Sequence, residues 1–422
     1  MIGNVVKNPS GNINLGPITV NGNYNFDVGR YKTASVSVTV EQPHIYGVTW
    51  SGGSSPVLTR TDDAVNFPNP NPYYSGMSST PYSPFDGLMP WAGIRRVTDA
   101  TAGELVEIPK FWYKLAYSGT ALQLQIADAP VAGFQTSPAH SDRGDGVGER
   151  DYIYVGRYQC ASDYKSKTGV NPKGNIERAA LRTNIHALGS NVWQFDFLTL
   201  FTIQMLYLVE YATWDCQAAI SYGTFASPSS GATVVACGGT DSMPYHTGTT
   251  ASSKTSYSNY MQYRYIEGAW SNAEIFVDGI TSGDYGAGCA TANKGGVYLI
   301  KNPANFTDNA NVGDYIGVAA PQSTAAHVNV SGNIKSFINT DRGFIPAEAE
   351  NNSNYDTYGC ANVRIAGGSS YPKHGRVLIV GGGTTQWRGA GIFGWGADVP
   401  YEGWSYGSVG GRLMVLPSSR II

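Results

Sequence analysis

Charge is scarce in this sequence. Asp, Glu, Lys and Arg make up 14% of the 422 residues, and the formal net charge is -3. A weakly acidic chain does not release counterions from a phosphate backbone, so we expect no nucleic-acid partner. With 42% hydrophobic residues, the chain is long enough for two or three domains with sizeable cores.

Long apolar runs are missing as well. Residues 1–7 contain no apolar core of the length that a signal peptide needs. The best candidate for a membrane span, 195–212, carries Asp196, Gln204 and Glu210. We therefore interpret this stretch as a buried helix and expect no membrane insertion.

Cysteines are few and widely spaced, and no two of them have CxxC spacing. Without a secretion signal, free thiols are the expectation, and one or two late-forming disulfides are the alternative. The five are Cys160, Cys216, Cys237, Cys289 and Cys360.

The motifs of common catalytic and metal sites are also missing. The sequence has no HExxH, no GxSxG and no P-loop lysine motif, and its six histidines show no pair at ligand spacing on a helix. We therefore expect no enzyme and no cofactor. Calcium remains an alternative in one acidic stretch, although its spacing departs from an EF-hand loop: Asp142, Asp145, Glu149 and Asp151. The same stretch contains Arg143-Gly144-Asp145, a known adhesion tripeptide, which we expect in an exposed turn.

Glycine and aromatic residues are abundant instead. The 52 glycines supply turns, and the 28 tyrosines and 9 tryptophans favour pleated, half-buried surfaces. Strands and loops should therefore outnumber helices. The same mixture is also typical of binding loops, where rigid aromatic side chains stand among small polar ones.

Periodicity predicts the main elements. Helical spacing predicts two helices, 175–188 and 191–212. Alternation and β-rich composition predict strands over 13–20, 34–40, 104–114, 122–126, 152–158, 296–300, 375–380 and 411–417. Six prolines within 67–90 indicate a linker. We predict three parts: an N-terminal assembly segment at 1–40, a β-rich middle module at 41–145, and a C-terminal domain at 146–422.

Several short segments resemble known proteins. The C-terminal part of the sequence resembles the variable proteins of diversity-generating retroelements. Three segments carry this resemblance: Val380-Gly381-Gly382, Ala390-Gly391-Ile392-Phe393 and Gly410-Gly411-Arg412-Leu413. Segments 45–50, 108–114, 196–199 and 204–211 are similar to phage and prophage fibre proteins. A strand, two helices, long loops and a terminal β-ribbon also resemble the element order of C-type-lectin folds.

The resemblance implies both a fold and a function. The fold would be α+β and β-rich, with N-terminal β segments before a C-type-lectin-like domain that has two helices and a C-terminal β-ribbon. The function would be that of a homotrimeric phage tail-fibre or tip protein in the virion. Its N-terminal segment would bind other tail proteins, and its C-terminal domain would bind a host-cell receptor, either protein or glycan.

Aromatic and polar residues in the C-terminal loops form the predicted ligand-binding face. Glycine-rich framework strands alternate there with loops, whose tips we expect at one end of the ribbon. The alternative is that Trp387, Trp395 and Trp404 are core residues. The predicted face contains Thr384, Thr385, Gln386, Trp387, Arg388, Trp395, Asp398, Tyr401, Glu402, Trp404 and Tyr406.

Three other functions remain as alternatives. A formylglycine-generating enzyme shares the lectin-like scaffold, but it uses a cysteine pair in the C-terminal half, and Cys360 stands without an evident partner beyond Cys289. A capsule depolymerase would need a long repeat solenoid, and the sequence shows no repeat of fixed period. A purely structural virion or fibre protein is the third.

Overall fold

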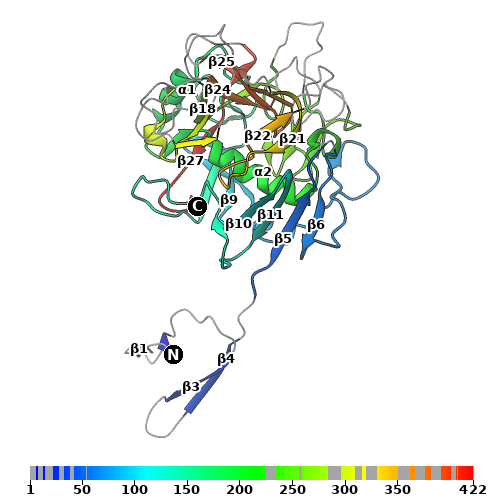
Figure 1. Cartoon of the computed structure of the whole chain (residues 1–422). Helices are drawn as coiled ribbons and strands as arrows, with labels where there is room; N and C mark the ends of the chain where they lie inside the picture. Colours follow the sequence, from blue (N-terminus) through cyan, green and yellow to red (C-terminus); the bar gives the residue numbers. More distant parts are fainter. Residues whose placement is uncertain are drawn as a thin grey trace. The chain divides into compact units, whose positions relative to one another are not determined.

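The chain folds into two compact units, Met1–His44 and Ile45–Ile422 (Figure 1). Their boundary lies close to the one predicted after residue 40. The computed structural model describes residues 6–7, 13–14, 22–27, 33–38, 42–53, 55–224, 234–255, 259–283, 296–308, 316–319, 330–349, 362–365, 376–381, 391–400, 405 and 407–421.

The small unit contains two antiparallel ribbons. Strand β1 (Val6–Lys7) pairs with β2 (Ile13–Asn14), and β3 (Gly22–Asp27) pairs with β4 (Thr33–Val38). The strand predicted over 34–40 is therefore confirmed as far as Val38. Of the strand predicted over 13–20, only Ile13–Asn14 lies within the described residues.

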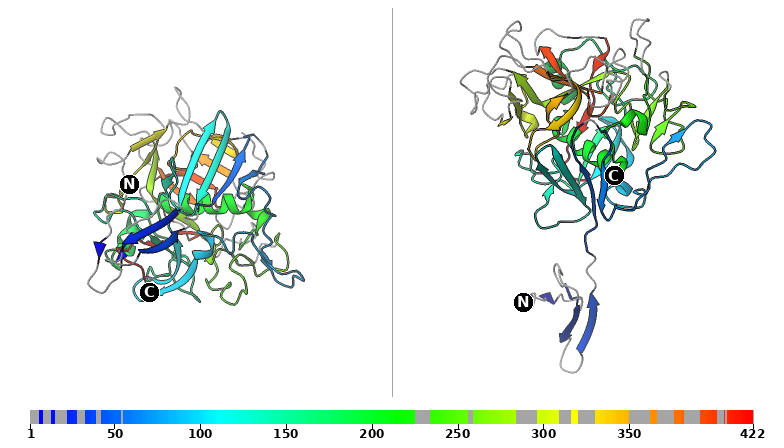
Figure 2. Two further views of the ribbon diagram at one scale, coloured as in Figure 1. Left: turned by 90° about the horizontal axis from the view of Figure 1, so that it is seen from below. Right: turned by 45° about the vertical axis from the view of Figure 1, so that its right-hand side comes forward.

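One antiparallel sheet of the large unit has the strand order β12-β10-β11-β5-β6. Its strands alternate between a buried and an exposed face, as in β5, where Tyr46, Val48 and Trp50 are buried. Figure 2 shows β5, β10 and β11 side by side. The strands are β5 (Ile45–Trp50), β6 (Thr59–Asp62), β10 (Trp112–Ser118), β11 (Ala121–Ala127) and β12 (Gln135–Thr136).

Helix α2 (Phe197–Tyr211) lies at the centre of the large unit, and all of its residues are buried. It contacts β5 and β11 on one side and β18 (Glu274–Gly283) on the other (Figure 1). The Asp196 side chain caps the helix by accepting from the Thr199 N–H, and Ala212 ends it in the left-handed region at φ 51. Among the described residues, no helix is long and apolar enough to cross a membrane.

The predicted start of this helix was wrong. Residues Val192–Gln194 form strand β14, and the helix begins at Phe197. Strand β14 pairs with β27 (Leu413–Val415) near the chain end. A strand partner more than two hundred residues away therefore decides the local structure, and helical spacing of apolar residues does not reveal it.

A second antiparallel sheet, β14-β27-β13-β9-β8, includes the C-terminal strand β27. Strand β9 pairs with β13, so residues 41–145 and 146–422 share one sheet, and the domain boundary predicted between them is absent. Helix α1 (Arg178–His186), shorter than predicted, packs on β14. The other strands are β8 (Arg95–Asp99), β9 (Gly103–Pro109) and β13 (Tyr152–Gly156).

The largest sheet has nine strands and is mixed, because β18 pairs with β26 and β23 pairs with β25 in parallel. Its main order is β20-β19-β18-β24-β25-β23-β21-β22. Beside β18, the strands are β19 (Gly296–Leu299), β20 (Ile316–Ala319), β21 (Val330–Phe337), β22 (Pro346–Ala349), β23 (Asn362–Ile365), β24 (Arg376–Val380), β25 (Trp395–Pro400) and β26 (Val409–Gly410).

Short elements complete the large unit. One of them is a four-stranded sheet with the strand order β17-β16-β15-β7. Among the described residues, strands far outnumber helices, which confirms the α+β, β-rich class. The remaining elements are β7 (Tyr73–Tyr74), β15 (Gly248–Thr249), β16 (Met261–Tyr263), β17 (Ile266–Glu267), α3 (Cys216–Ala219), η1 (Trp91–Gly93) and η2 (Pro303–Asn305).

The proline-rich segment 67–90 is packed into the large unit and is not a linker. The Phe85 ring is fully buried, with its centroid 5.2 Å from Phe67, 5.7 Å from Tyr46 and 4.5 Å from Trp91. Prolines still prevent long strands here, but the aromatic side chains between them add to the core.

Arg412 ties distant segments together from inside the core. Its side chain is 2% exposed, and its guanidinium donates to the carbonyls of Gly156, Arg157, Glu267 and Gly268 at 2.6–3.1 Å. A buried guanidinium is tolerated only when its N–H groups are paired, so these four carbonyls fix the position of the C-terminal strand.

The glycines before Arg412 are required by close packing. A Cβ atom on Gly410 would lie 2.2 Å from the Lys173 carbonyl oxygen, and one on Gly411 would lie 2.3 Å from Leu181. The Gly410-Gly411-Arg412 motif therefore has a structural explanation in this chain.

The core predictions for Phe201, Leu208 and Phe393 are confirmed, since all three side chains are at most 1% exposed. Phe201 contacts Tyr113 and Phe344 edge-on, at centroid distances of 5.8 and 5.0 Å. We expect Phe201→Ala to lower the free energy of unfolding by ~3–5 kcal/mol in denaturant titrations. Tyr82→Ala, at a 42% exposed residue, is the control and should cost less than ~1 kcal/mol. Equal effects would show that Phe201 is not a core residue.

Candidate functional site

Most of the predicted binding face cannot be placed. Of its two partly described members, Asp398 lies in β25, and Trp395 begins that strand. The Trp395 side chain is 4% exposed and packs edge-on against Phe197 at 5.6 Å. The expectation that Trp395 is exposed was therefore wrong, and this tryptophan belongs to the core. The others lie outside the described residues: Thr384, Thr385, Gln386, Trp387, Arg388, Tyr401, Glu402, Trp404 and Tyr406.

We expected the tips of the two C-terminal loops at one end of the ribbon, and those tips lie outside the described residues. Strand registers place only the ends of the loops. Val380 pairs with Trp395, and Arg376 pairs with Pro400. Segment 382–390 therefore joins the β24–β25 pair at its Val380 end, whereas residues 401–402 follow Pro400 at the other end. The ends are about 13 Å apart at ~3.3 Å per residue. Loops before and after a single strand leave it at opposite ends, and the connection after Pro400 returns to Val409, which pairs with Glu274 near the Val380 end.

The Pro400 end belongs to an edge that crosses five strands. Registers align Ala319, Val297, Ser282, Arg376 and Pro400 across β20, β19, β18, β24 and β25. We call this row the Pro400 edge. The connection 284–295 joins β18 to β19 here, because Gly283 pairs with Gly296.

Two more connections begin and end on the side of the Pro400 edge. Residues 320–329 run from Ala319 to Val330, and residues 366–375 run from Ile365 to Arg376. Ile365 pairs with Val330, and β23 is parallel to β25, so both strand ends point toward this edge. Strand pairing thus places the described ends of three long connections on the same side of the sheet as Pro400. The sequence did not reveal this grouping, because it contains no local signal of which strands pair and in which register.

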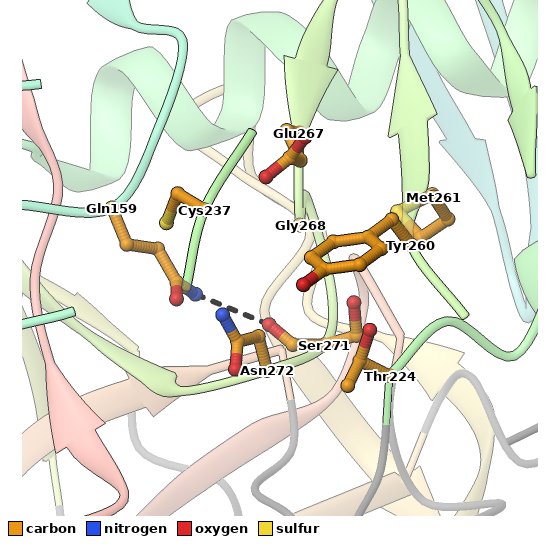
Figure 3. A pocket seen from close by; sticks show the side chains of 9 residues that line it. All are labelled: Gln159, Thr224, Cys237, Tyr260, Met261, Glu267, Gly268, Ser271 and Asn272. Carbon is orange, nitrogen blue, oxygen red and sulfur yellow. Dashed lines mark hydrogen bonds between the residues drawn. The ribbon is translucent and has the colours of Figure 1, made fainter. Parts of the chain in front are cut away.

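A small hollow beside β16 and β17 is a second candidate. Figure 3 shows Glu267, Cys237 and Tyr260 around it, with the Gln159 amide donating to the Ser271 carbonyl at 3.1 Å. Its cavity volume is about 10 Å³, which is room for about one water molecule and far below the roughly 300–1,000 Å³ of most small-molecule sites.

The polar groups of this hollow are occupied. The Glu267 carboxylate accepts from the Gly238 and Thr240 N–H groups and from the Thr240 hydroxyl, at 2.6–2.8 Å. Burial nevertheless raises the pKa of Glu267. Gln159 and Asn272 are also hydrogen-bonded to backbone groups. This arrangement holds loops together and leaves little hydrogen-bonding capacity for a ligand.

One hydroxyl–imidazole pair looks like a nucleophile with its base. Ser137 Oγ lies 2.6 Å from His140 Nδ1, and His140 Nε2 donates to the Ile108 carbonyl at 2.9 Å. Both residues are 0% exposed, and burial lowers the pKa of His140 to about 4. A substrate cannot reach this hydroxyl, so the pair is structural.

The adhesion tripeptide is not displayed. Arg143 is 0% exposed, forms an ion pair with the buried Asp196, and donates from Nε to the Lys301 carbonyl at 2.7 Å. Only the turn around Gly144 is exposed. The expectation of an exposed Arg143-Gly144-Asp145 was therefore wrong, because its arginine forms an ion pair with Asp196, the residue that caps α2.

The acidic stretch beside it is bound to basic and hydroxyl groups. Asp145 pairs with Arg150 at 2.5 Å, and Asp151 pairs with Lys110 at 2.6 Å. Glu149 accepts from the Thr136 hydroxyl, and Asp142 accepts from the Gly144 N–H. Within the described ranges, no group of three or more His, Cys, Asp or Glu side chains is arranged to hold a metal.

A polar cluster, buried at Glu210 and Arg264 and exposed at Asp86, joins the end of α2 to two loops. Glu210 accepts from Arg264 Nη2 at 2.6 Å and Nε at 3.1 Å, and Asp86 accepts from His246 at 2.8 Å and Tyr245 at 2.6 Å. Burial alone would raise the pKa of Asp86, but the hydrogen bonds from His246 and Tyr245 outweigh it and lower that pKa. The Ser83 N–H also bonds to Asp86, so this carboxylate is saturated and structural.

Glu107, in strand β9 next to the edge strand β8, forms a similar clamp in the second sheet. Its 0% exposed side chain accepts from Arg95, Arg420 and Tyr154 at 2.6–3.2 Å. Burial alone would raise its pKa, but hydrogen bonds from Arg420, Arg95 and Tyr154 lower the pKa of Glu107 to about 2.

No protein-family model matches this chain, and no curated protein matches it.

The Glu107 clamp should make stability depend on acid. Its pKa falls from 4.5 to about 2 on folding, so its contribution is present above pH 4.5 and is lost as the pH falls toward 2. We expect the midpoint of thermal unfolding to fall over this range, and to fall less in Glu107→Gln. Glu149→Gln, at a half-exposed side chain, is the control and should follow the parent curve. Parallel curves for all three proteins would contradict this role.

The described thiols should be inert in the folded protein. Cys160, Cys216 and Cys237 are free and buried, and burial raises the pKa of Cys160 and of Cys237 to about 12. Because the thiolate is the reactive form, iodoacetamide at pH 8 should leave all three unmodified until denaturant is added. Peptide mass mapping measures this, and native labelling of Cys160 would contradict its burial.

Proposed function

We propose that this chain is a receptor-binding protein of a phage tail, with a C-type-lectin-like large unit that attaches to the host-cell surface. The observation that carries the proposal is that the described ends of three long connections lie on the same side of a nine-stranded sheet as Pro400. Loops grouped on a rigid scaffold are the usual construction of a binding site.

The scaffold can hold this edge without help from the loop side chains. The framework positions Val377, Leu378, Val380, Ile392 and Phe393 are all at most 3% exposed. Packing of these apolar side chains stabilises the sheet, so the side chains of the connections are not needed for folding. A binding face of this kind tolerates sequence change, which fits the resemblance to retroelement variable proteins.

The small unit fits an attachment role. Its described strands form only two-stranded ribbons, and such ribbons are marginally stable alone. We propose that it binds other tail proteins, and that the whole protein is a homotrimer in the virion. A reverse-transcriptase gene beside the coding sequence, with a near-copy of its 3′ end that differs at adenines, would support the retroelement origin.

The proposal is tested by adsorption of the purified chain to a panel of bacterial isolates. We expect Tyr401→Ala with Trp404→Ala to leave the thermal unfolding midpoint nearly unchanged and to remove adsorption, because aromatic side chains dominate binding energies. Trp395→Ala is the contrasting variant: it truncates a core residue and should lower stability by ~3–5 kcal/mol. Lost folding with unchanged adsorption per folded molecule, for the Tyr401 and Trp404 pair, would mean that these residues are scaffold.

A further inference from the structure

We infer that the solvent face of the five-stranded sheet carries a binding site for one sugar unit of an uncharged glycan, built around Asp62. Strands β10, β11, β5 and β6 lie side by side in that order and supply the site. The Pro400 edge belongs to a different sheet. The inference therefore does not rest on the proposed receptor-binding function.

Asp62 has an unusual backbone conformation that turns its carboxylate to solvent. It pairs with Tyr46, which is 2% exposed, so a regular strand would place residue 62 on the buried face of the sheet. Instead Asp62 has φ 56, in the left-handed region, and its side chain is exposed. A residue with a Cβ atom adopts this conformation at a cost.

Gly47 makes room for this carboxylate in the middle of the sheet. A Cβ atom at residue 47 would lie 2.2 Å from Asp62 Oδ2 and 2.3 Å from Thr61 Oγ1. Glycine weakens the interior of a strand, and it marks places where another group approaches the backbone closely. Strands β5 and β6 therefore both depart from their preferred residues to hold one carboxylate over the solvent face.

Two side chains orient the Asp62 carboxylate, one from β6 and one from β11. Thr61 Oγ1 donates to Asp62 Oδ2 at 2.8 Å, and Gln125 Nε2 donates to Oδ1 at 2.9 Å. All three side chains are partly or fully exposed, and bonds between exposed groups stabilise a fold little, because water competes for them. Stability therefore does not explain the costs at Asp62 and Gly47, and such costs are typical of functional sites.

The same groups keep hydrogen-bonding capacity for a ligand. A carboxylate has about four acceptor positions, and the bonds from Thr61 and Gln125 use two of them. Gln125 is opposite Gly47 on one side and opposite the exposed Lys114 on the other. Lys114, Gln125 and Asp62 thus form a row of donors and acceptors at strand spacings of ~4.8 Å, close to the width of one sugar ring.

The charges of this row favour an uncharged ligand. An anion would be repelled by Asp62 and a cation by Lys114, whereas the two together leave the row neutral. Adjacent hydroxyls of a neutral sugar donate to a carboxylate and accept from an amide or an ammonium group, so they match all three side chains.

Saturation-transfer NMR on the full-length chain tests the site with four neutral monosaccharides: glucose, galactose, mannose and N-acetylglucosamine. A few exposed hydrogen bonds give weak binding, so we expect at least one of these sugars to bind with a Kd on the order of 1–10 mM. Glucuronate and galacturonate, whose carboxylates would approach Asp62, should bind more weakly. The absence of binding by all four neutral sugars, or stronger binding of the acidic ones, would overturn the inference.

Two variants alter the site and leave the core unchanged. Asp62→Asn removes the charge and keeps a residue type that tolerates the left-handed region. Gly47→Ala places a Cβ atom against the side chains of Asp62 and Thr61. Each variant should lose the saturation-transfer signal of the sugar and should keep its thermal unfolding midpoint within ~4 °C of the parent.

Matched controls carry the same substitutions elsewhere. Gly87→Ala adds a Cβ atom that would meet nothing within 4 Å, and Asp142→Asn changes an exposed carboxylate that accepts from the Gly144 N–H. Both controls should bind the sugar like the parent. Binding retained in folded Asp62→Asn would overturn the inference, and this variant decides the question if Gly47→Ala does not fold.

Discussion

The burial of the Arg412 guanidinium is the constraint on which the large unit depends. Burial lowers the pKa of Arg412 to about 10, and its N–H groups are bonded to four carbonyls from two distant segments. Removing any of those segments would leave a buried donor unpaired, which costs more than one ordinary hydrogen bond contributes. The C-terminal strand therefore cannot fold apart from residues 156–157 and 267–268.

Helix α2 imposes a second constraint, because its whole circumference must be covered. It has the five-stranded sheet on one side and β18 on the other, and its polar side chains are bonded inside the protein. Glu210 bonds to Arg264 and Tyr263, and Gln204 bonds to the Ile392 carbonyl. A helix buried on every side joins sheets that come from both halves of the sequence. The single large unit, in place of the two predicted domains, follows from this.

Several of the few charged side chains of this protein form buried ion clusters. Glu107, Asp196 and Asp308, whose side chains are at most 9% exposed, all bond to arginines inside the fold. These charges orient segments and are not available to partners.

The sequence alone determined the local features. Apolar spacing located the body of α2, and alternation located strands such as Tyr152–Gly156 and Arg376–Val380. Only the tertiary structure decided where α2 begins and that Arg143 and Trp395 are buried. It also decided that residues 382–390 precede β25 at one end of the strand and residues 401–402 follow it at the other. Of the candidate site, the sequence supplied the residue types but not their grouping. The physical reason is that strand register and burial depend on partners far along the chain, and local periodicity contains no information about those partners.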